Sequence, residues 1–389
     1  ETTSVALKET IGVPVGTTVF EDIALCDAMF FFGQNTGTNS PRFLHPLQEA
    51  AKRGVKIITF NPVREKGLES FINPQNPGQM LTGNATQIST QYHQVKVGGD
   101  IAVLTGIAKH VFAADDAAKA AGTKRVLDVD FIAQHTDGLD AFEALVRATS
   151  WQDIEAQSGL DRSAIEAAAQ VYVEAERVIG VYGMGLTQHA HGFDNVAMFV
   201  NMLLLRGNIG REGAGICPVR GHSNVQGQRT VGIAEKPELV PLDKIAAQFG
   251  FEPPRDTGMN TVEVCEGLLA GKVKAFIGLG GNFVRAMPDH SVVQPAWHRM
   301  RLTVQIATKL NHSHLLNGEV AYLLPCLGRS EQDMQESGPQ TVTMEDTFSH
   351  IHGSIGRRSP ASEHLKSEIA IVAGLAKATL PRNPKVDWD

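Results

Sequence analysis

The stretch IGREGAGICPVRGHSNVQGQR, residues 209–229, is the one around which the rest of the chain is organised. It combines five glycines and three arginines with His222 and several amide side chains. Glycine backbones take positive φ and approach ligands closely, and arginines and amides donate to phosphate or carboxylate groups. Because the strongly apolar segment 196–205 precedes it, we predict a polar ligand loop mounted on a buried helix. An ordinary long surface loop is the alternative.

The N-terminal part of the chain shows the strand–loop–helix–strand order of a βαβ unit. The continuous apolar run Ala28–Phe32 is typical of a strand buried on both faces, and a second strand is predicted over 55–60. A helix over 42–53 joins them. Ligands of such sheets bind beyond the carboxyl ends of the strands, so the loops 33–40 and 61–66 are candidate ligand loops. Turns without a ligand are the alternative.

Further elements extend the α/β pattern through the chain. Strands are predicted over 94–97, 178–182, 274–277, 302–306 and 322–324. Helices are predicted over 101–112, 114–121, 139–149, 162–176, 195–206, 261–270, 289–300 and 366–378. Asp100 and Asp194 are expected to cap the helices that follow them. The strand near residue 277 leads into a second ligand-type loop, 278–285.

The composition excludes several classes of protein. The 389 residues are 42% hydrophobic and carry a formal charge of −7, which argues against general binding to nucleic acid. No apolar run approaches the ~20 residues of a membrane span. No G-x-G-x-x-G motif supports an ordinary NAD or FAD fingerprint.

The cysteines and histidines give no sign of a metal site. None of the four cysteines forms a C-x-x-C pair, so neither zinc nor an iron–sulfur cluster is indicated. Buried free thiols in a reducing compartment are expected, and we predict a cytoplasmic protein. Three His-x-His pairs lack a visible third ligand, so no metal ligand is assigned.

Three runs of sequence carry a resemblance to a known family. They are 183–227 (GMGLTQHAHGFDNVAMFVNMLLLRGNIGREGAGICPVRGHSNVQG), 31–66 (FFGQNTGTNSPRFLHPLQEAAKRGVKIITFNPVREK) and 95–112 (VKVGGDIAVLTGIAKHVF). In order and spacing they resemble the molybdopterin oxidoreductases of the DMSO-reductase type, and among these the formate-dehydrogenase-like alpha subunits. The resemblance implies two doubly wound Rossmann-like α/β units. A domain that binds molybdopterin guanine dinucleotide is expected over 1–222, and a second, incomplete α/β domain over 223–389.

The resemblance also implies parts that this chain does not carry. They are an N-terminal iron–sulfur domain, a C-terminal β-barrel, and a cysteine or selenocysteine metal ligand that would fall just before Glu1. We therefore expect the chain to be the central fragment of a larger oxidoreductase and to be inactive alone. A [4Fe–4S] cluster is expected only in the full-length protein.

The cofactor implied is bis(molybdopterin guanine dinucleotide) with molybdenum or tungsten. Its pyrophosphates need backbone N–H groups at glycine loops and helix N-termini. Cofactor-binding positions are carried over onto Gly33, Asn35, Thr38, Asn39, Asn61, Pro62, Arg64, Gly98, Gly99, Asp100, Gly183, Met184, Gly185, Gln188, Gly221, Asn224, Gln226, Gly278, Gly280 and Asn282.

Arg220 is the residue expected to carry the chemistry. By resemblance, PVRGHSNVQG matches the motif whose arginine lies beside the metal in formate dehydrogenases. A fixed guanidinium there would orient a small carboxylate such as formate, the expected substrate. A structural or phosphate-binding arginine is the alternative. His222 is the second catalytic candidate, at a position where many relatives carry Gln, and an electron-transfer partner is expected.

Two other functions stay open at this point. One is a nucleotide-binding or scaffold module without catalysis of its own. The other is an α/β enzyme that uses NAD or thiamine diphosphate, against which the absent G-x-G-x-x-G speaks. Nitrate or a sulfoxide could also replace formate as the substrate.

Overall fold

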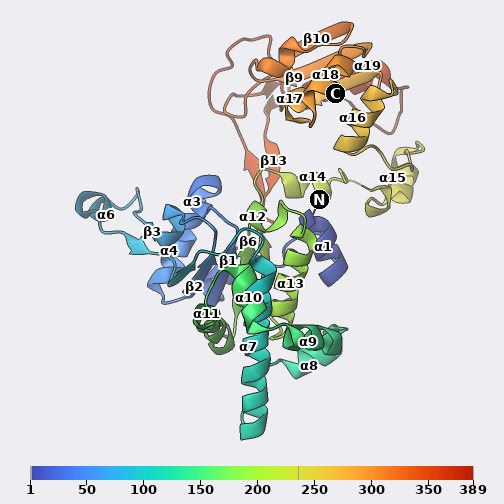
Figure 1. Cartoon of the computed structure of the whole chain (residues 1–389). Helices are drawn as coiled ribbons and strands as arrows, with labels where there is room; N and C mark the ends of the chain where they lie inside the picture. The colour runs from blue at the N-terminus through green and yellow to red at the C-terminus, as the bar shows by residue number, and fades with distance from the viewer. Residues whose placement is uncertain (1, 235, 389) are drawn as a thin grey trace. The chain divides into compact units, whose positions relative to one another are not determined.

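The computed structural model describes residues 2–234 and 236–388, and these divide into two compact units. Unit 1 comprises the residues up to Gln226 together with Glu345–His350, and unit 2 comprises Gly227–Met344 and the residues from Ile351 onward (Figure 1). The functional division after residue 222 stays a prediction. Both units are α/β, as predicted.

Unit 1 is built on a five-stranded parallel sheet of order β5-β2-β1-β6-β7. The strands are β1 (Ala28–Phe32), β2 (Lys56–Phe60), β5 (Gln91–His93), β6 (Val178–Tyr182) and β7 (Gly215–Pro218). From β1 the chain adds β2 and β5 on one side, then β6 and β7 on the other. The strand order therefore reverses between β1 and β6, which is the topological switch point where ligands of such sheets bind.

Helices cover both faces of this sheet because alternate side chains of β1 point to opposite sides. Phe30 and Phe32 pack in one core with α1 (Thr2–Ile11), α7 (Asp100–Ala121), α11 (Arg162–Glu174) and α13 (Gly192–Leu204). Met29 and Phe31 pack in a second core with α4 (Leu44–Lys52). The doubly wound architecture of unit 1 is thus confirmed, and β1 is buried at all five positions.

Shorter elements complete unit 1. They are α2 (Asp22–Leu25), α3 (Thr36–Asn39), η1 (Pro41–Phe43), α5 (Lys66–Glu69), β3 (Ser70–Phe71), α6 (Pro77–Thr82), β4 (Thr86–Gln87), α8 (Val129–His135), α9 (Leu139–Ala148), α10 (Trp151–Ser158) and α12 (Met184–Thr187).

The central stretch 209–229 is not a loop throughout, and the prediction is wrong in its middle. Gly215–Pro218 is strand β7, buried at all four positions and paired with β6. Ile216 enters one core and Cys217 the other. A four-residue strand among glycines has too short an apolar run to be recognised, and its pairing with β6 decides its conformation. Helix α14 (Val225–Thr230) then follows.

Four further local predictions are corrected. The strand expected over 94–97 is wrong, because the sheet ends with β5 at His93. Asp100 does not cap α7, since the helix begins at Asp100 with Gly99 as its N-cap residue. The same helix runs on to Ala121, because the alanine-rich sequence after Phe112 favours helix and contains no breaker. Asp194 likewise lies in the first turn of α13 rather than before it.

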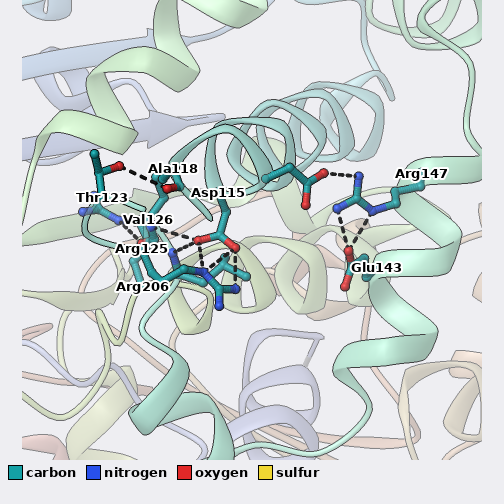
Figure 2. Close-up of polar contacts among 10 residues, drawn as sticks. Asp115, Ala118, Thr123, Arg125, Val126, Glu143, Arg147 and Arg206 are labelled. Atoms are coloured by element: carbon teal, nitrogen blue, oxygen red, sulfur yellow. Dashed lines mark hydrogen bonds and ion pairs between the residues drawn. The ribbon is translucent and has the colours of Figure 1, made fainter. Parts of the chain in front are cut away.

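A charged network ties the C-terminal half of α7 to its neighbours (Figure 2). Asp115 is only 3% exposed and accepts hydrogen bonds from Arg125 Nε at 2.9 Å and from the backbone N–H groups of Val126 and Leu127. Although burial raises the pKa of Asp115, the bonds from Arg125 and the backbone outweigh it and lower the pKa. Arg147 pairs with both Asp116 and Glu143. The network is structural, because each of these charges has a protein partner.

Unit 2 contains a three-stranded parallel sheet of order β10-β9-β8. The strands are β8 (Ala275–Leu279), β9 (Leu302–Ala307) and β10 (Val320–Pro325), close to the predicted ranges. Helices α16 (Thr261–Leu269), α17 (Phe283–Ala286) and α18 (His290–Trp297) form one core, and α19 (Glu368–Thr379) packs against Val304 and Ile306 in another. The remaining elements are η2 (Pro237–Leu239), α15 (Leu242–Phe249), η3 (His312–Leu315), β11 (Met334–Gln335), β12 (Gly338–Pro339), β13 (Val342–Glu345) and β14 (Ile351–Ser354).

Two further observations concern the cysteines and the helices of both units. The four cysteines are free and buried, as expected. Of the helices in residues 2–234 and 236–388, none combines the length and apolar character needed to cross a membrane.

Candidate active site

The loops that follow β1 and β6 cross at the switch point with almost no space between them. Gly33 has φ +56°, and a Cβ atom placed on it would lie 2.5 Å from the backbone nitrogen of Leu186. The N–H of Gly185 donates to the carbonyl of Gly33 at 3.1 Å, and a Cβ on Gly183 would lie 2.7 Å from that same oxygen. These three glycines, predicted for their approach to a cofactor, are therefore required first by the crossing of the two loops.

A cluster of amide side chains joins the ends of β1 and β2. The Asn61 side chain makes two hydrogen bonds to the backbone of Gln34. Its Nδ2 donates to the Gln34 carbonyl at 2.6 Å, and its Oδ1 accepts the Gln34 N–H at 3.1 Å. The Gln34 Oε1 in turn accepts from the Asn35 N–H and from Asn39 Nδ2. Both neighbours of that oxygen are donors, which fixes the orientation of the Gln34 amide.

Gln34 was missed by sequence reasoning, although it lies within a predicted ligand loop. It is 2% exposed, and its Nε2 has no hydrogen-bond partner among the residues described. A buried donor without an acceptor is costly, so the geometry suits an acceptor from a bound molecule. Its place directly after a buried strand was the available signal. The missing partner is evident only in the folded structure.

The loop carrying Arg220 adjoins this crossing. The N–H of Val219 donates to the carbonyl of Tyr182 at 2.9 Å, at the end of β6. A Cβ on Gly221 would lie 3.6 Å from Met184 Sδ. Arg220 is half-buried, and its Nη2 donates to the carbonyl of Pro14 at 3.3 Å. The structure thus brings Arg220 and Gly221 next to the 183–185 loop.

Several other predicted positions lie at this edge but already have protein contacts. Asn224 and Gln226 hydrogen bond to residues of segment 345–350. The Arg64 side chain pairs with Glu69 at 2.5 Å and lies over the ring of Tyr92. A phosphate-binding role for Arg64 would require an exchange of partners and stays a prediction.

The remaining positions of unit 1 are more open. The Thr38 N–H donates to Asn35 Oδ1 at 3.2 Å, and the Pro62 carbonyl accepts from Gln94 Nε2 at 3.3 Å. His222, Gln188 and Pro62 are exposed. Their assignment to catalysis or cofactor binding therefore stays a prediction.

The N-terminus of the 22-residue helix α7 forms another part of this edge. A Cβ on Gly98 would meet nothing within 4 Å, whereas one on Gly99 would lie 2.8 Å from the carbonyl of Gln157. Gly98 therefore leaves room for a ligand, and Gly99 is required by packing against the end of α10. Asp100 is 5% exposed, and burial raises its pKa to about 6.

Replacing Asp100 with asparagine is expected to stabilise the protein at pH 8. The pKa of Asp100 is about 6 in the folded state, above the ordinary 3.8. Protonated Asp100 therefore stabilises the folded protein relative to ionised Asp100. The stabilisation of the folded state by protonated Asp100 is lost as the pH rises from about 4 through about 6. Asparagine does not ionise, so it is not subject to this loss. We expect a gain of about 2 kcal/mol in unfolding free energy at pH 8 and none at pH 4.

Urea titrations at the two pH values would measure this difference. The matched control is Asp130→Asn, since Asp130 also lies in the first turn of a helix but is exposed. A gain for Asp100→Asn that is equal at both pH values would contradict the assigned titration.

The cofactor-binding positions predicted in unit 2 lie at the carboxyl end of β8. A Cβ on Gly278 would lie 2.6 Å from the ring of Phe276, so a larger residue here would require that ring to move. Gly280 has φ +67° and donates its N–H to the carbonyl of Ile306. Asn282 is exposed and precedes α17. These residues form a strand-end loop of the predicted kind within unit 2.

The two histidines of the first His-x-His pair have different neighbours. His189 Nε2 lies 2.7 Å from Asn195 Nδ2, and His191 Nδ1 lies 3.6 Å from Asp194 Oδ2. Across residues 2–234 and 236–388, no group of three or more His, Cys, Asp or Glu side chains is placed to hold a metal ion.

Comparisons with known proteins identify the family to which the chain belongs. A family model described as molybdopterin oxidoreductase matches residues 4–316. Protein YdeP of Escherichia coli (strain K12) is 49% identical over 389 residues, 100% of this chain and 51% of that protein. Formate dehydrogenase H of the same strain is 25% identical over 309 residues, 77% of this chain and 39% of that protein.

The fold also matches a solved structure. Acetylene hydratase from Pelobacter acetylenicus superposes with a TM-score of 0.66 at 16% sequence identity. The superposition covers 96% of this chain and 49% of that one, and it is evidence for the fold alone. In sequence, too, the chain spans about half the length of Protein YdeP.

Proposed function

Since this chain belongs to the molybdopterin oxidoreductase family, we propose that it is the central cofactor-binding portion of a formate-dehydrogenase-like enzyme. Family membership implies a pterin cofactor with molybdenum or tungsten. Its form is proposed to be bis(molybdopterin guanine dinucleotide). A [4Fe–4S] cluster and an electron-transfer partner are proposed only for a protein of the relatives' full length.

One observation carries this proposal. The loops after β1 and β6 cross at the switch point and enclose the Gln34 amide, whose Nε2 lacks an acceptor among the described residues. A phosphate or pterin oxygen would satisfy that donor. The open Gly98 at the N-terminus of α7 leaves room for an anionic group as well. The residues present therefore fit the cofactor.

The proposed substrate is formate, and Arg220 is the proposed residue that orients it. A guanidinium presents paired donors that match both oxygens of a carboxylate. Oxidation of formate gives carbon dioxide, one proton and two electrons, and the bound cofactor would supply the two-electron acceptor. His222, two positions further on, is the proposed acceptor for the proton. The likeness to formate dehydrogenase H supports this choice of substrate.

The first test is elemental analysis of a protein of the relatives' full length that contains this chain, made with cofactor biosynthesis intact. About one molybdenum or tungsten atom per chain is expected. Gln34→Glu keeps the Oε1 contacts but replaces the buried donor with an oxygen, so metal occupancy should fall by about tenfold, as for loss of a charged-group hydrogen bond. Gln157→Glu, at an exposed position, is the matched control.

Two outcomes would contradict these assignments. Absence of both metals from the unmodified protein would favour a nucleotide-binding or scaffold module without catalysis. Full metal occupancy in Gln34→Glu would show that Gln34 does not contact the cofactor.

A further inference from the structure

Segment Glu345–His350 packs against the Arg220 motif, although it lies far along the chain. Thr347 follows Arg220 by 127 positions, yet its Oγ1 accepts the backbone N–H of Arg220 at 3.1 Å. The segment joins the paired strands β13 and β14 and belongs to unit 1. The contact is therefore a long-range one within a single compact unit.

Two amides of the motif complete the contact. Asn224 Oδ1 accepts the N–H of Glu345 at 2.9 Å. Gln226 is 1% exposed, and its Nε2 donates to Glu345 Oε1 at 3.2 Å and to Ser349 Oγ at 2.8 Å. Asn224 and Ser349 both have positive φ, 67° and 61°, which is uncommon for residues other than glycine. Such conformations persist where the surroundings hold them.

Phe348 anchors the segment in the core of unit 1. Its ring meets those of Phe20 and Phe43 edge to face, each at 5.7 Å between centroids. Phe348 packs against the same core as Phe31 of β1. Because these ring contacts fix the position of Phe348, they also hold the neighbouring hydrogen-bonding residues in place.

We propose that residues 345–350 form a latch that positions Arg220 for substrate binding. On one side the Arg220 backbone is held by β7 and by the contact of Val219 with Tyr182, and on the other by Thr347. A guanidinium that grips a small carboxylate must be held to within about 0.5 Å. Thr347 and Gln226 are thus positioning residues, and their effect on the substrate rests on the role proposed for Arg220.

The first arm of the test measures the latch itself by hydrogen exchange of the Arg220 backbone amide. Thr347→Val removes the acceptor and keeps the shape, so that amide should exchange at least about tenfold faster, as expected for loss of one hydrogen bond. Thr347→Ser retains a hydroxyl and should restore protection. The matched control is Thr343→Val, at an exposed position of β13 outside the latch. Unchanged exchange in Thr347→Val would overturn the latch.

The second arm measures kinetics with formate in a cofactor-loaded protein of the relatives' full length that contains this chain. Thr347→Val should raise KM about tenfold, while kcat and metal content stay within about twofold, because a loosened Arg220 weakens substrate binding alone. Thr347→Ser should restore KM. If metal content, kcat and thermal stability instead fall together, the segment is merely structural and the positioning role is overturned.

The two arms separate this proposal from the proposed function. If the unmodified protein carries its metal but does not oxidise formate, the assigned substrate is wrong. The exchange measurement would still decide whether residues 345–350 hold the Arg220 loop.

Discussion

Arg220→Ala, made in a protein of the relatives' full length, is expected to lower kcat/KM for formate by about 10²- to 10⁴-fold and to leave metal content unchanged. The substitution would remove the two charge-assisted hydrogen bonds that we propose between Arg220 and the carboxylate, each of about 1.5–3 kcal/mol. The loop itself should persist, because its backbone is held by Thr347 and by the pairing of β7 with β6. Steady-state kinetics together with elemental analysis would measure both quantities.

The arginine series provides its own controls. Arg220→Lys keeps the positive charge but loses the paired donors of the guanidinium, so kcat/KM for formate should remain low. Arg211→Ala removes an exposed arginine of the same stretch that donates to the Glu176 carbonyl, and kcat/KM should change by less than about twofold. Wild-type activity in Arg220→Ala would show that this arginine is structural.

Gly33→Ala is expected to destabilise unit 1 by at least about 4 kcal/mol. The φ of +56° alone disfavours alanine by about 1–2 kcal/mol. In addition, the new methyl group would lie 2.5 Å from the backbone of Leu186, which no side-chain movement can relieve. The loops after β1 and β6 would have to separate. Urea unfolding, followed with a probe in each unit because the two need not unfold together, would measure the loss.

Gly54→Ala is the matched control for this prediction. Gly54 also has positive φ, +88°, but a Cβ there would meet nothing within 4 Å. The expected loss is therefore only the conformational term, about 1–2 kcal/mol. Equal losses for the two variants would show that the crossing of the loops adds nothing to the cost at Gly33.

Regular apolar patterns made much of the architecture predictable. The runs 28–32 and 178–182 identified the two central strands, because a parallel strand buried on both faces is apolar throughout. The strands of unit 2 and the helix near 195–206 followed from the same kind of local signal. Strand β7 was missed, since four residues between glycines carry little local preference. Its conformation depends on the distant strand β6.

The candidate site, like the fold, was predictable from the sequence only in part. Sequence placed glycines and amides at the carboxyl ends of the strands, and the structure brings Gly33, Asn61 and Gly183 together there. The sequence could not show which of the predicted glycines have open space beside them. Gly98 faces open space, whereas Gly33 and Gly183 face another loop. That distinction depends on contacts between backbone segments about 150 residues apart in the chain. The paired residues of β1 and β6 are separated by the same distance in sequence.

By itself, then, the sequence determined the α/β class, the central strands and the family motifs around Arg220, because these depend on residues close together in the chain. Only the tertiary structure decided that Gln34 keeps a donor without an acceptor among the described residues, and that residues 345–350 hold the Arg220 loop. Hydrogen-bond partners are chosen by packing among distant segments, and local preferences extend over only a few residues.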